Sequence, residues 1–159
     1  MQRRIEQKAE ELLIKNYQKY YRLAYTYVKS EQDALDAVQE SAYKVIRGCR
    51  KVKQDEYLDT WITRIVINTA MDLLRKRSAT VLVDPQEEEW GEAQEDTYQD
   101  LDLQQALAYL DTNERTTVIL RFFEDRKLEE IAEITEVGVN TVKSRLYRAL
   151  KKLKITLEA

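Results

Sequence analysis

Apolar residues recur at helical spacing through the first half of the chain and predict three amphipathic helices. The first covers Ile5 to Lys29. The second begins after Ser30, a good N-cap with Asp33 three residues later, and ends near Gly48. The third is the stretch "DTWITRIVINTAMDLLRKRSA", residues 59–79. The apolar face of the second helix is expected to bury Leu35, Val38, Ala42, Val45 and Ile46.

The third predicted helix carries two stripes of different chemistry. The apolar stripe contains Ile62, Ile65, Val66, Thr69 and Leu73. The other stripe contains Trp61, Arg64, Asn68, Met71 and Arg75. Aromatic rings stack on bases, amides hydrogen-bond base edges, and cations hold phosphates, so the second stripe fits a nucleic-acid surface. A core tryptophan beside a basic helix end fits the same pattern, and periodicity does not separate these two interpretations.

The second half of the chain also reads as helical. An apolar-periodic helix is predicted over Leu101 to Leu110. Asp111 and Glu114 then form a D-x-x-E pattern, which is typical of a capping box, and they open a helix that continues through Phe123.

The stretch "LEEIAEITEVGVNTVKSRLYRALKKL" has the spacing of a helix-turn-helix. It predicts a short helix over Leu128 to Thr135, a turn over Glu136 to Val139, and a longer helix capped by Asn140. The small side chain of Ala132 suits a close approach of the two helices.

The longer helix of this motif separates an apolar face from a polar one. The apolar face contains Val142, Leu146, Ala149, Leu150 and Leu153. The side chains expected to point away from the core are Asn140, Thr141, Ser144, Tyr147, Arg148 and Lys151, with Lys143 and Arg145 at the margins. Such a face fits the DNA major groove, where arginine binds guanine bidentately. A solvated helix without a partner is the alternative, and the coincidence of periodicity, turn spacing and clustered cations favours DNA.

Composition restricts the classes of protein further. The chain has only three glycines and one proline, which suits an all-α fold. A single cysteine excludes an internal disulfide, which favours an intracellular protein. The absence of histidine removes the common zinc sites and the usual general base. We therefore expect no metal, no cofactor and no enzymatic activity. No apolar run reaches the ~18 residues of a membrane span, so we expect a cytoplasmic protein that does not insert into the membrane.

Charge is distributed unevenly along the chain and suggests the domain boundaries. Residues 1–78 carry a net charge of +5, residues 79–114 carry −11 with no base, and residues 115–159 carry +3. The segment "DPQEEEWGEAQEDTYQD" contains the only proline and few residues able to enter a core. We therefore expect two small helical domains, residues 1–78 and 99–159, joined by an acidic linker over 79–98. An acidic strap that mimics nucleic acid is the alternative interpretation of this segment.

Three blocks in this order resemble one known family. "DALDAVQESAYKVI", "TWITRIVINTAMDLLRKR" and the helix-turn-helix stretch are similar to the extracytoplasmic-function (ECF) group of bacterial RNA polymerase sigma factors. The resemblance implies an alternative sigma factor that promotes transcription initiation. Its first domain binds the polymerase clamp helices and the −10 promoter element, and its second binds the −35 element and the polymerase flap. It also implies control by an anti-sigma factor, often membrane-tethered, in a stress response.

The resemblance assigns roles to residues by position. It implies that core polymerase is bound by Asp33, Asp36, Gln39 and Glu40. It implies that the opened −10 strand meets Trp61, Arg64 and Asn68, and that the loop from Cys49 to Asp59 captures an unstacked base. Arg75, in the basic end of the same helix, adds a cation that can hold a DNA phosphate. The −35 readers of the family match Lys143, Ser144, Tyr147 and Arg148, and the same helix face adds Asn140, Thr141 and Lys151.

Some positions depart from the family pattern, and two other classes of protein compete with it. Glu136 stands where the family turn usually has glycine, Ala42 where an aromatic is common, and Asp111 where proline is common. We expect neighbouring Gly138 to absorb the strain of the turn.

A stand-alone helix-turn-helix regulator leaves the acidic second helix and the Trp61 stripe without a role. A nucleic-acid enzyme lacks both histidine and a clustered carboxylate set.

Overall fold

The computed structural model describes residues 2–80 and 105–158, and all regular secondary structure in these ranges is helical. The all-α prediction is therefore confirmed for the described residues. The chain divides into two compact units, Met1–Thr80 and Val81–Ala159. The linker predicted for residues 79–98 lies outside the described residues, apart from its first two positions, which are still helical.

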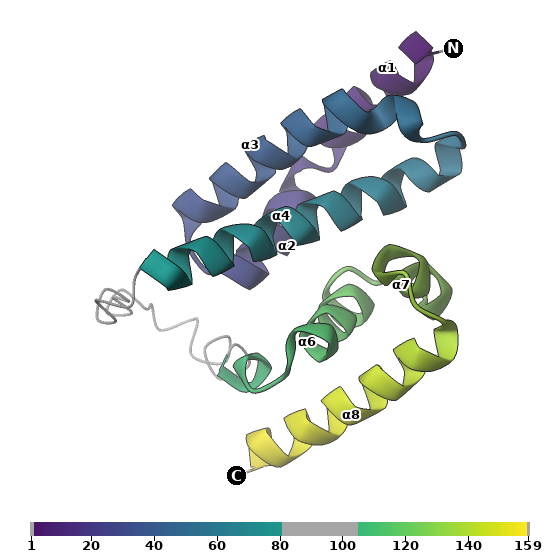
Figure 1. Ribbon diagram of the computed structural model, residues 1–159. Helices are drawn as coiled ribbons and strands as arrows, with labels where there is room; N and C mark the ends of the chain where they lie inside the picture. The colour runs from purple at the N-terminus through teal and green to yellow at the C-terminus, as the bar shows by residue number, and fades with distance from the viewer. Residues whose placement is uncertain (1, 81–104, 159) are drawn as a thin grey trace. The chain divides into compact units, whose positions relative to one another are not determined.

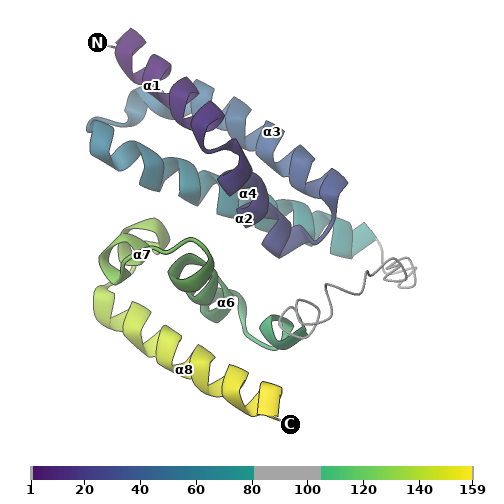
Figure 2. The ribbon, with the colours of Figure 1, turned by 180° about the vertical axis from the view of Figure 1, so that it is seen from behind.

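The first unit is a bundle of four helices. These are α1 (Gln2–Lys15), α2 (Tyr17–Val28), α3 (Glu31–Gly48) and α4 (Leu58–Thr80). Two 3-10 turns, η1 (Cys49–Lys51) and η2 (Asp55–Tyr57), connect α3 to α4. Helices α2, α3 and α4 pack against one another, while α1 packs on α3 and η1 (Figures 1 and 2).

The single helix predicted over Ile5 to Lys29 is broken at Asn16, so that prediction is wrong at this point. Asn16 has φ −104° and ψ 22°, outside helical geometry, although helix-like hydrogen bonds continue on both sides of it. The two helices on either side of the break have different neighbours: α1 packs on η1 and α3, whereas α2 packs on both α3 and α4.

Helix α3 buries Val38 and Val45 as predicted, but the rest of its buried face differs from the prediction. Leu35 and Ile46 were expected in the core, but each is 37% exposed. The face that is buried consists of Ala34, Ala37, Val38, Ser41 and Val45. Small side chains at three of these five positions allow neighbouring helices to lie close, because the distance between packed helices depends on the side chains at the contact.

Close packing also explains the glycine at the end of α3. A Cβ atom at Gly48 would lie 3.2 Å from Cζ2 and 3.3 Å from Cη2 of Trp61 on α4. The predicted end of the helix at Gly48 is correct. The residue is not in a left-handed conformation, however, and its small size accommodates the indole ring.

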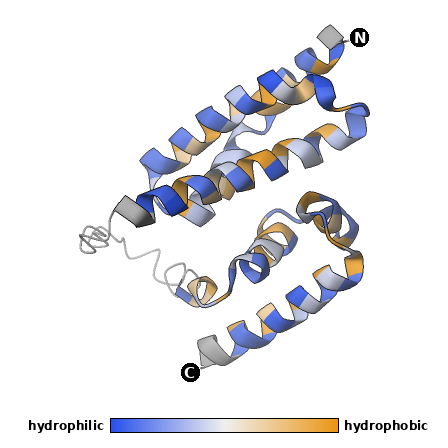
Figure 3. Ribbon diagram, in the orientation of Figure 1, coloured by the Kyte–Doolittle hydropathy of each residue, from blue (hydrophilic) through white to orange (hydrophobic). Residues whose placement is uncertain are grey.

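The second unit contains α6 (Thr112–Val118), the π-helix η6 (Ile119–Phe123), α7 (Leu128–Thr135) and α8 (Val139–Glu158) (Figure 1). Residues 105–108 are also helical, and the rest of the helix predicted over Leu101 to Leu110 is either a turn or lies outside the described residues. The core cluster contains Ala106, Leu107, Leu110, Val118, Ala149 and Leu153. Hydrophilic and hydrophobic positions alternate along the helices of both units, as amphipathic helices require (Figure 3).

The predicted cap between the two helical stretches of the second unit is present. The Asp111 side chain accepts from the backbone N–H of Glu114 at 2.8 Å, and the Glu114 side chain accepts from the backbone N–H of Asp111 at 3.1 Å. This is the reciprocal arrangement of a capping box. The helix reaches Phe123 as predicted, but its last five residues form a π-turn that ends when the Glu124 N–H donates to the carbonyl of Ile119 at 3.0 Å.

The turn of the helix-turn-helix differs from expectation in two details. Glu136 itself adopts the left-handed conformation, with φ 60° and ψ 42°, whereas Gly138 does not have a positive φ and does not absorb the strain. Asn140 is not the cap of α8. The helix starts at Val139, and the Gly138 carbonyl accepts from the N–H groups of Thr141 and Val142, both at 3.1 Å. A left-handed backbone costs free energy at a residue that has a side chain. Here that cost is offset because the Val137 N–H donates to the Ala132 carbonyl at 3.1 Å and so satisfies the C-terminal end of α7.

Candidate functional surfaces

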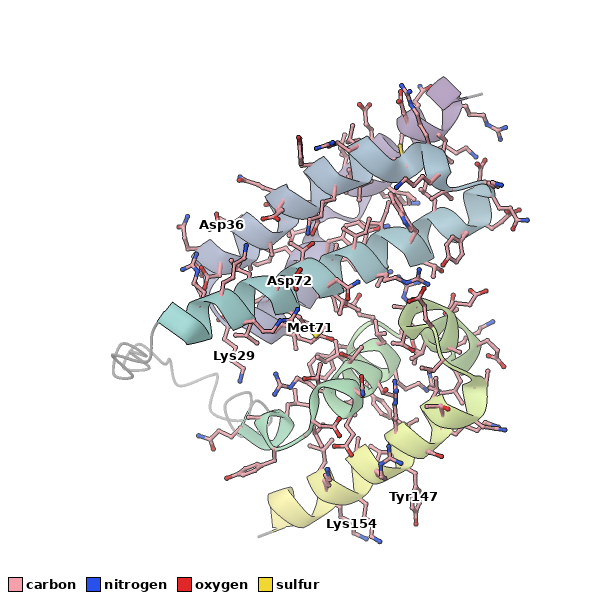
Figure 4. The ribbon with its side chains drawn as sticks, viewed as in Figure 1. Lys29, Asp36, Met71, Asp72, Tyr147 and Lys154 are labelled. Carbon is pink, nitrogen blue, oxygen red and sulfur yellow. The ribbon has the colours of Figure 1, made fainter. Side chains whose placement is uncertain are left out.

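The acidic start of α3 combines structural and exposed carboxylates. The Ser30 hydroxyl caps the helix by accepting from the Asp33 N–H at 3.2 Å. The Asp33 side chain is only 15% exposed and lies 2.9 Å from Nη2 of Arg77 on α4. Asp36 is 46% exposed and lies 3.7 Å from the same guanidinium (its position on α3 is labelled in Figure 4). Asp33 therefore contributes mainly to the fold, and Asp36 is the more available of the two.

Gln39 and Glu40 are exposed on the same helix, and apolar side chains accompany them. Glu40 is paired with Lys44 one turn later at 3.6 Å. Leu35 and Ile46 are 37% exposed and Tyr43 is 61% exposed. The sequence analysis assigned Leu35 and Ile46 to the core and gave Tyr43 no role. The small residues Ala34, Ala37 and Ser41 on the neighbouring face could have indicated that this other face packs in the bundle. We call Leu35, Asp36, Gln39, Glu40, Tyr43 and Ile46 the α3 surface.

The mixed stripe on α4 is only partly exposed. Trp61 is half-buried against Gly48. The hydroxyl of Tyr57 lies 2.7 Å from Nη2 of Arg64, whose guanidinium carbon also lies 5.7 Å from the tyrosine ring centroid. Asn68 is exposed. The stripe thus presents one ordered cation, one exposed amide and the accessible part of one indole.

Arg75, the last candidate on α4, makes an ion pair with Asp72 within the same helix. Asp72 and Met71 are labelled on this helix in Figure 4. Arg75 itself is exposed, with 69% of its side chain accessible, so the pair leaves it able to reach a phosphate.

The connection between α3 and α4 is fastened to α1 by ion pairs. Asp55 lies 2.7 Å from Nζ of Lys8 and 3.1 Å from Nη2 of Arg4. Nε of Arg50 lies 2.7 Å from Glu6. The hydrogen bond from Lys8 holds the pKa of Asp55 below its usual range. This connection is the loop that the resemblance implicated in base capture, and α1 restrains it on both sides.

Cys49 starts this connection but takes no part in its exposed surface. It is fully buried, and burial raises the pKa of its thiol. A buried thiol with a raised pKa is a poor nucleophile and acts as a small apolar residue here.

All candidate DNA readers of the second unit lie exposed on α8. They are Asn140, Thr141, Lys143, Ser144, Tyr147, Arg148 and Lys151. Tyr147 is 70% exposed, and Figure 4 shows it extending from α8 together with Lys154. Opposite this face, Val142, Ala149 and Leu153 are buried as predicted. Leu150 was expected to be buried but is 41% exposed.

One buried carboxylate connects this reading face to α6. Glu114 is 1% exposed, and its Oε1 accepts from Nζ of Lys152 at 2.8 Å. Its Oε2 lies 3.6 Å from Nε of Arg148. Sequence reasoning identified Glu114 only as a cap residue. The contact with α8 spans 38 positions in the sequence, and no local pattern encodes it.

None of the described helices is long and apolar enough to cross a bilayer. Within the same ranges, no three acidic or cysteine side chains are grouped so that they could share a metal ion.

Comparison with known proteins gives two family matches and several relatives. Residues 12–80 match the family described as "Sigma-70 region 2", and residues 100–153 match "Sigma-70, region 4". RNA polymerase sigma factor SigV of Bacillus subtilis is 48% identical over 141 residues, covering 88% of this chain and 85% of that protein. The ECF RNA polymerase sigma-E factor of Salmonella typhimurium is 34% identical over 161 residues, covering 91% and 84%.

Two solved structures share the fold at low sequence identity. CnrH in complex with the cytosolic domain of CnrY gives a TM-score of 0.75 at 21% identity, covering 94% of this chain and 87% of that one. The sigma factor RpoE of Bartonella quintana, in complex with the anti-sigma factor NepR, gives 0.71 at 21% identity, covering 94% and 96%.

Proposed function

The chain belongs to the ECF group of RNA polymerase sigma factors, and from this premise we propose which of its residues carry each step of transcription initiation. It is an alternative sigma factor that binds core polymerase, recognises −35 and −10 promoter elements and promotes initiation. In this role the protein itself makes or breaks no covalent bond. Its contribution is binding free energy, which is used to hold polymerase at a promoter and to stabilise unpaired bases.

Recognition of the −35 element is assigned to the outer face of α8. The observation that carries this assignment is that all seven candidate readers are exposed on one helix of a helix-turn-helix whose opposite face is buried. Arg148 and Lys143 provide donors for base edges and phosphates, and the short side chains of Thr141 and Ser144 allow the helix to lie close to the bases.

Strand opening is assigned to α4 and to the connection that precedes it. Asn68 offers an amide for a base edge, the accessible part of Trp61 offers an aromatic plane, and Arg64 is a cation held in place by Tyr57. An unpaired strand presents base edges and ring faces to such groups, whereas a duplex presents mainly its backbone. Base stacking is worth about 1–3 kcal/mol per base, enough over several bases to offset the cost of unstacking them.

Binding to core polymerase is assigned to the α3 surface. Exposed apolar side chains beside carboxylates match what an interface needs, a desolvated centre with charged groups that set orientation. Asp33 is assigned a supporting role, because its pairing with Arg77 anchors the start of α3 to the end of α4.

We further propose that an anti-sigma protein holds this factor inactive in the cytoplasm until a stress signal releases it. The support is a likeness of fold to RpoE, whose structure was solved with the anti-sigma factor NepR. The exposed apolar part of the α3 surface is a suitable site for such a partner. An anti-sigma protein bound there would exclude polymerase directly.

The test of the whole proposal is transcription in vitro with purified core polymerase and a promoter of the related factors. The parent protein should start transcription at that promoter and not at one with scrambled −35 and −10 elements. Arg148→Ala should lower initiation specifically at the matched −35 sequence, by about 1–3 kcal/mol in binding, while Lys151→Ala should weaken binding evenly and reduce its salt dependence. Equal activity of the parent protein on both promoters would refute the proposal.

A further inference from the structure

Glu114 combines complete burial with two cationic neighbours that remain exposed. Its side chain is 1% accessible, while those of Lys152 and Arg148 are 48% and 55% accessible. Both cations belong to α8, the helix proposed to read the −35 element, and Glu114 belongs to α6. A charge that is taken out of water in this way is stable only with partners, so the carboxylate constrains where the two cations lie.

The two oxygens of Glu114 are used differently. Oε1 accepts both from the Asp111 N–H at 3.1 Å and from Nζ of Lys152 at 2.8 Å. Oε2 lies 3.6 Å from Nε of Arg148. The approach of Glu114 to Arg148 is through Nε, so it does not use the two terminal amino groups that form a fork on guanine.

We propose that Glu114 is a positioning residue for promoter recognition, orienting the guanidinium of Arg148 for a base of the −35 element. Lys152 acts as the second counter-charge, so that the buried carboxylate does not repel the DNA phosphates. This inference rests on the proposed function and adds to it a residue that does not touch DNA. Arginine has many rotamers in solution, and holding it near its bound orientation lowers the conformational cost of binding.

A purely structural role for Glu114, as part of the capping box of α6, makes different predictions. The variant Glu114→Gln separates the two roles. Its amide oxygen can still accept from the Asp111 N–H, and its volume is nearly unchanged, but it lacks the charge that attracts Arg148 and Lys152. Asp111→Ala is the matched control, because it removes the other half of the capping box and leaves the Glu114 charge in place.

The experiment measures the affinity of full-length protein, as holoenzyme, for a promoter with the matched −35 element and for one with the base opposite Arg148 changed. Glu114→Gln should lower the ratio of the two affinities by about threefold to tenfold, a fraction of the loss expected for Arg148→Ala. In an Arg148→Ala background, Glu114→Gln should have no further effect on the ratio. Lys152→Gln and Asp111→Ala should leave the ratio unchanged.

A second readout observes the contact without DNA. The Nε–H resonance of Arg148 in NMR spectra of the free protein should shift and exchange faster with water in Glu114→Gln than in the parent. An unchanged ratio for Glu114→Gln, with a parent that discriminates between the promoters, would overturn the positioning role alone. A parent that does not discriminate would overturn the proposed function and this inference together.

Discussion

Asn68 is exposed on α4, while its companions Trp61 and Arg64 are partly buried and engaged in contacts within the bundle. Of the three, it is therefore the residue whose replacement tests DNA contact with the least effect on the fold. Trp61 fills the space above Gly48, and Arg64 lies over Tyr57, so replacing either one changes intramolecular contacts as well.

We predict that Asn68→Ala slows or abolishes open-complex formation on duplex promoter DNA. A template already melted across the −10 region by mismatches should largely restore it, because the lost contact helps to offset the cost of unstacking bases and that cost is already met on such a template. Permanganate footprinting of unpaired thymines measures open-complex formation on the duplex template and on the pre-melted template. Arg75→Ala is the control. Its exposed side chain is suited to phosphate contact and should affect the two templates alike. Normal opening of the duplex by Asn68→Ala would show that this helix does not capture the strand.

Glu136 carries the left-handed conformation that ends α7, with φ 60°. Glu136→Gly and Glu136→Ala both remove the side-chain contacts of glutamate, but only alanine keeps a Cβ atom in the disfavoured region. We predict that the glycine variant is more stable than the alanine variant by about 1 kcal/mol. Hydrogen exchange of the α7 and α8 amides measures this difference within the second unit.

Gly138 supplies the contrast to Glu136 within the same turn. It has no positive φ, and nothing lies within 4 Å of the position of an added Cβ. Gly138→Ala should therefore be neutral or stabilising, by up to about 1 kcal/mol. A strongly destabilising Gly138→Ala would mean that the strain of the turn lies at Gly138 after all.

At the scale of the element, α3 has one small-residue face buried in the bundle and one mixed face that is exposed and proposed to bind a partner. We predict that Asp36→Arg combined with Gln39→Ala weakens binding to core polymerase while helical content is retained. The reversed charge at position 36 opposes the partner and also lies near Arg77. Fluorescence-detected binding to core enzyme gives the affinity, and circular dichroism gives the helical content.

A control on α1 matches this pair in spacing and chemistry. Gln7 and Glu10 are both exposed and lie three residues apart, as Asp36 and Gln39 do. Glu10→Arg combined with Gln7→Ala should leave the affinity for core polymerase unchanged. Equal loss of affinity in the two pairs of variants would show a general charge effect and not docking through α3.

The connection between α3 and α4 depends on α1 through Asp55. The pKa of Asp55 is lowered in the folded protein, so its contribution to stability is present above its unfolded pKa of about 3.9 and is lost as the pH falls through the lower folded value. We predict that Asp55→Asn is less stable than the parent at neutral pH and that the difference disappears in acid. Denaturant unfolding from pH 7 to pH 2 measures it. A difference that stays constant with pH would contradict the ion pair with Lys8.

At the scale of the whole molecule, each unit buries its own core, and the segment predicted as a linker joins the two surfaces proposed to bind polymerase and promoter DNA. Joined surfaces act at an effective concentration of about millimolar, so the second contact follows the first readily. We predict that cutting the chain at a protease site inserted within residues 84–98 leaves helical content unchanged but strongly lowers promoter-specific initiation at micromolar protein. Initiation by the cut protein at the uncut rate would show that the two halves need no covalent connection.

The features that depend on neighbouring residues were already determined by the sequence. The Ser30 cap, the capping box of Asp111 and Glu114, the boundaries of α7 and the exposed polar face of α8 were all predicted correctly. Each rests on a hydrogen bond within three residues or on the 3.6-residue period of a helix, and both are properties of a short stretch of chain.

The features that depend on distant partners were decided only by the tertiary structure. Which face of α3 is buried follows from how closely α2 and α4 approach it. The helix has two adjacent apolar stripes, and the sequence of the helix alone does not determine which of them is buried. The burial of Glu114 against Arg148 and Lys152 joins residues more than 30 positions apart, because only folding brings a carboxylate on α6 out of water and beside cations on α8.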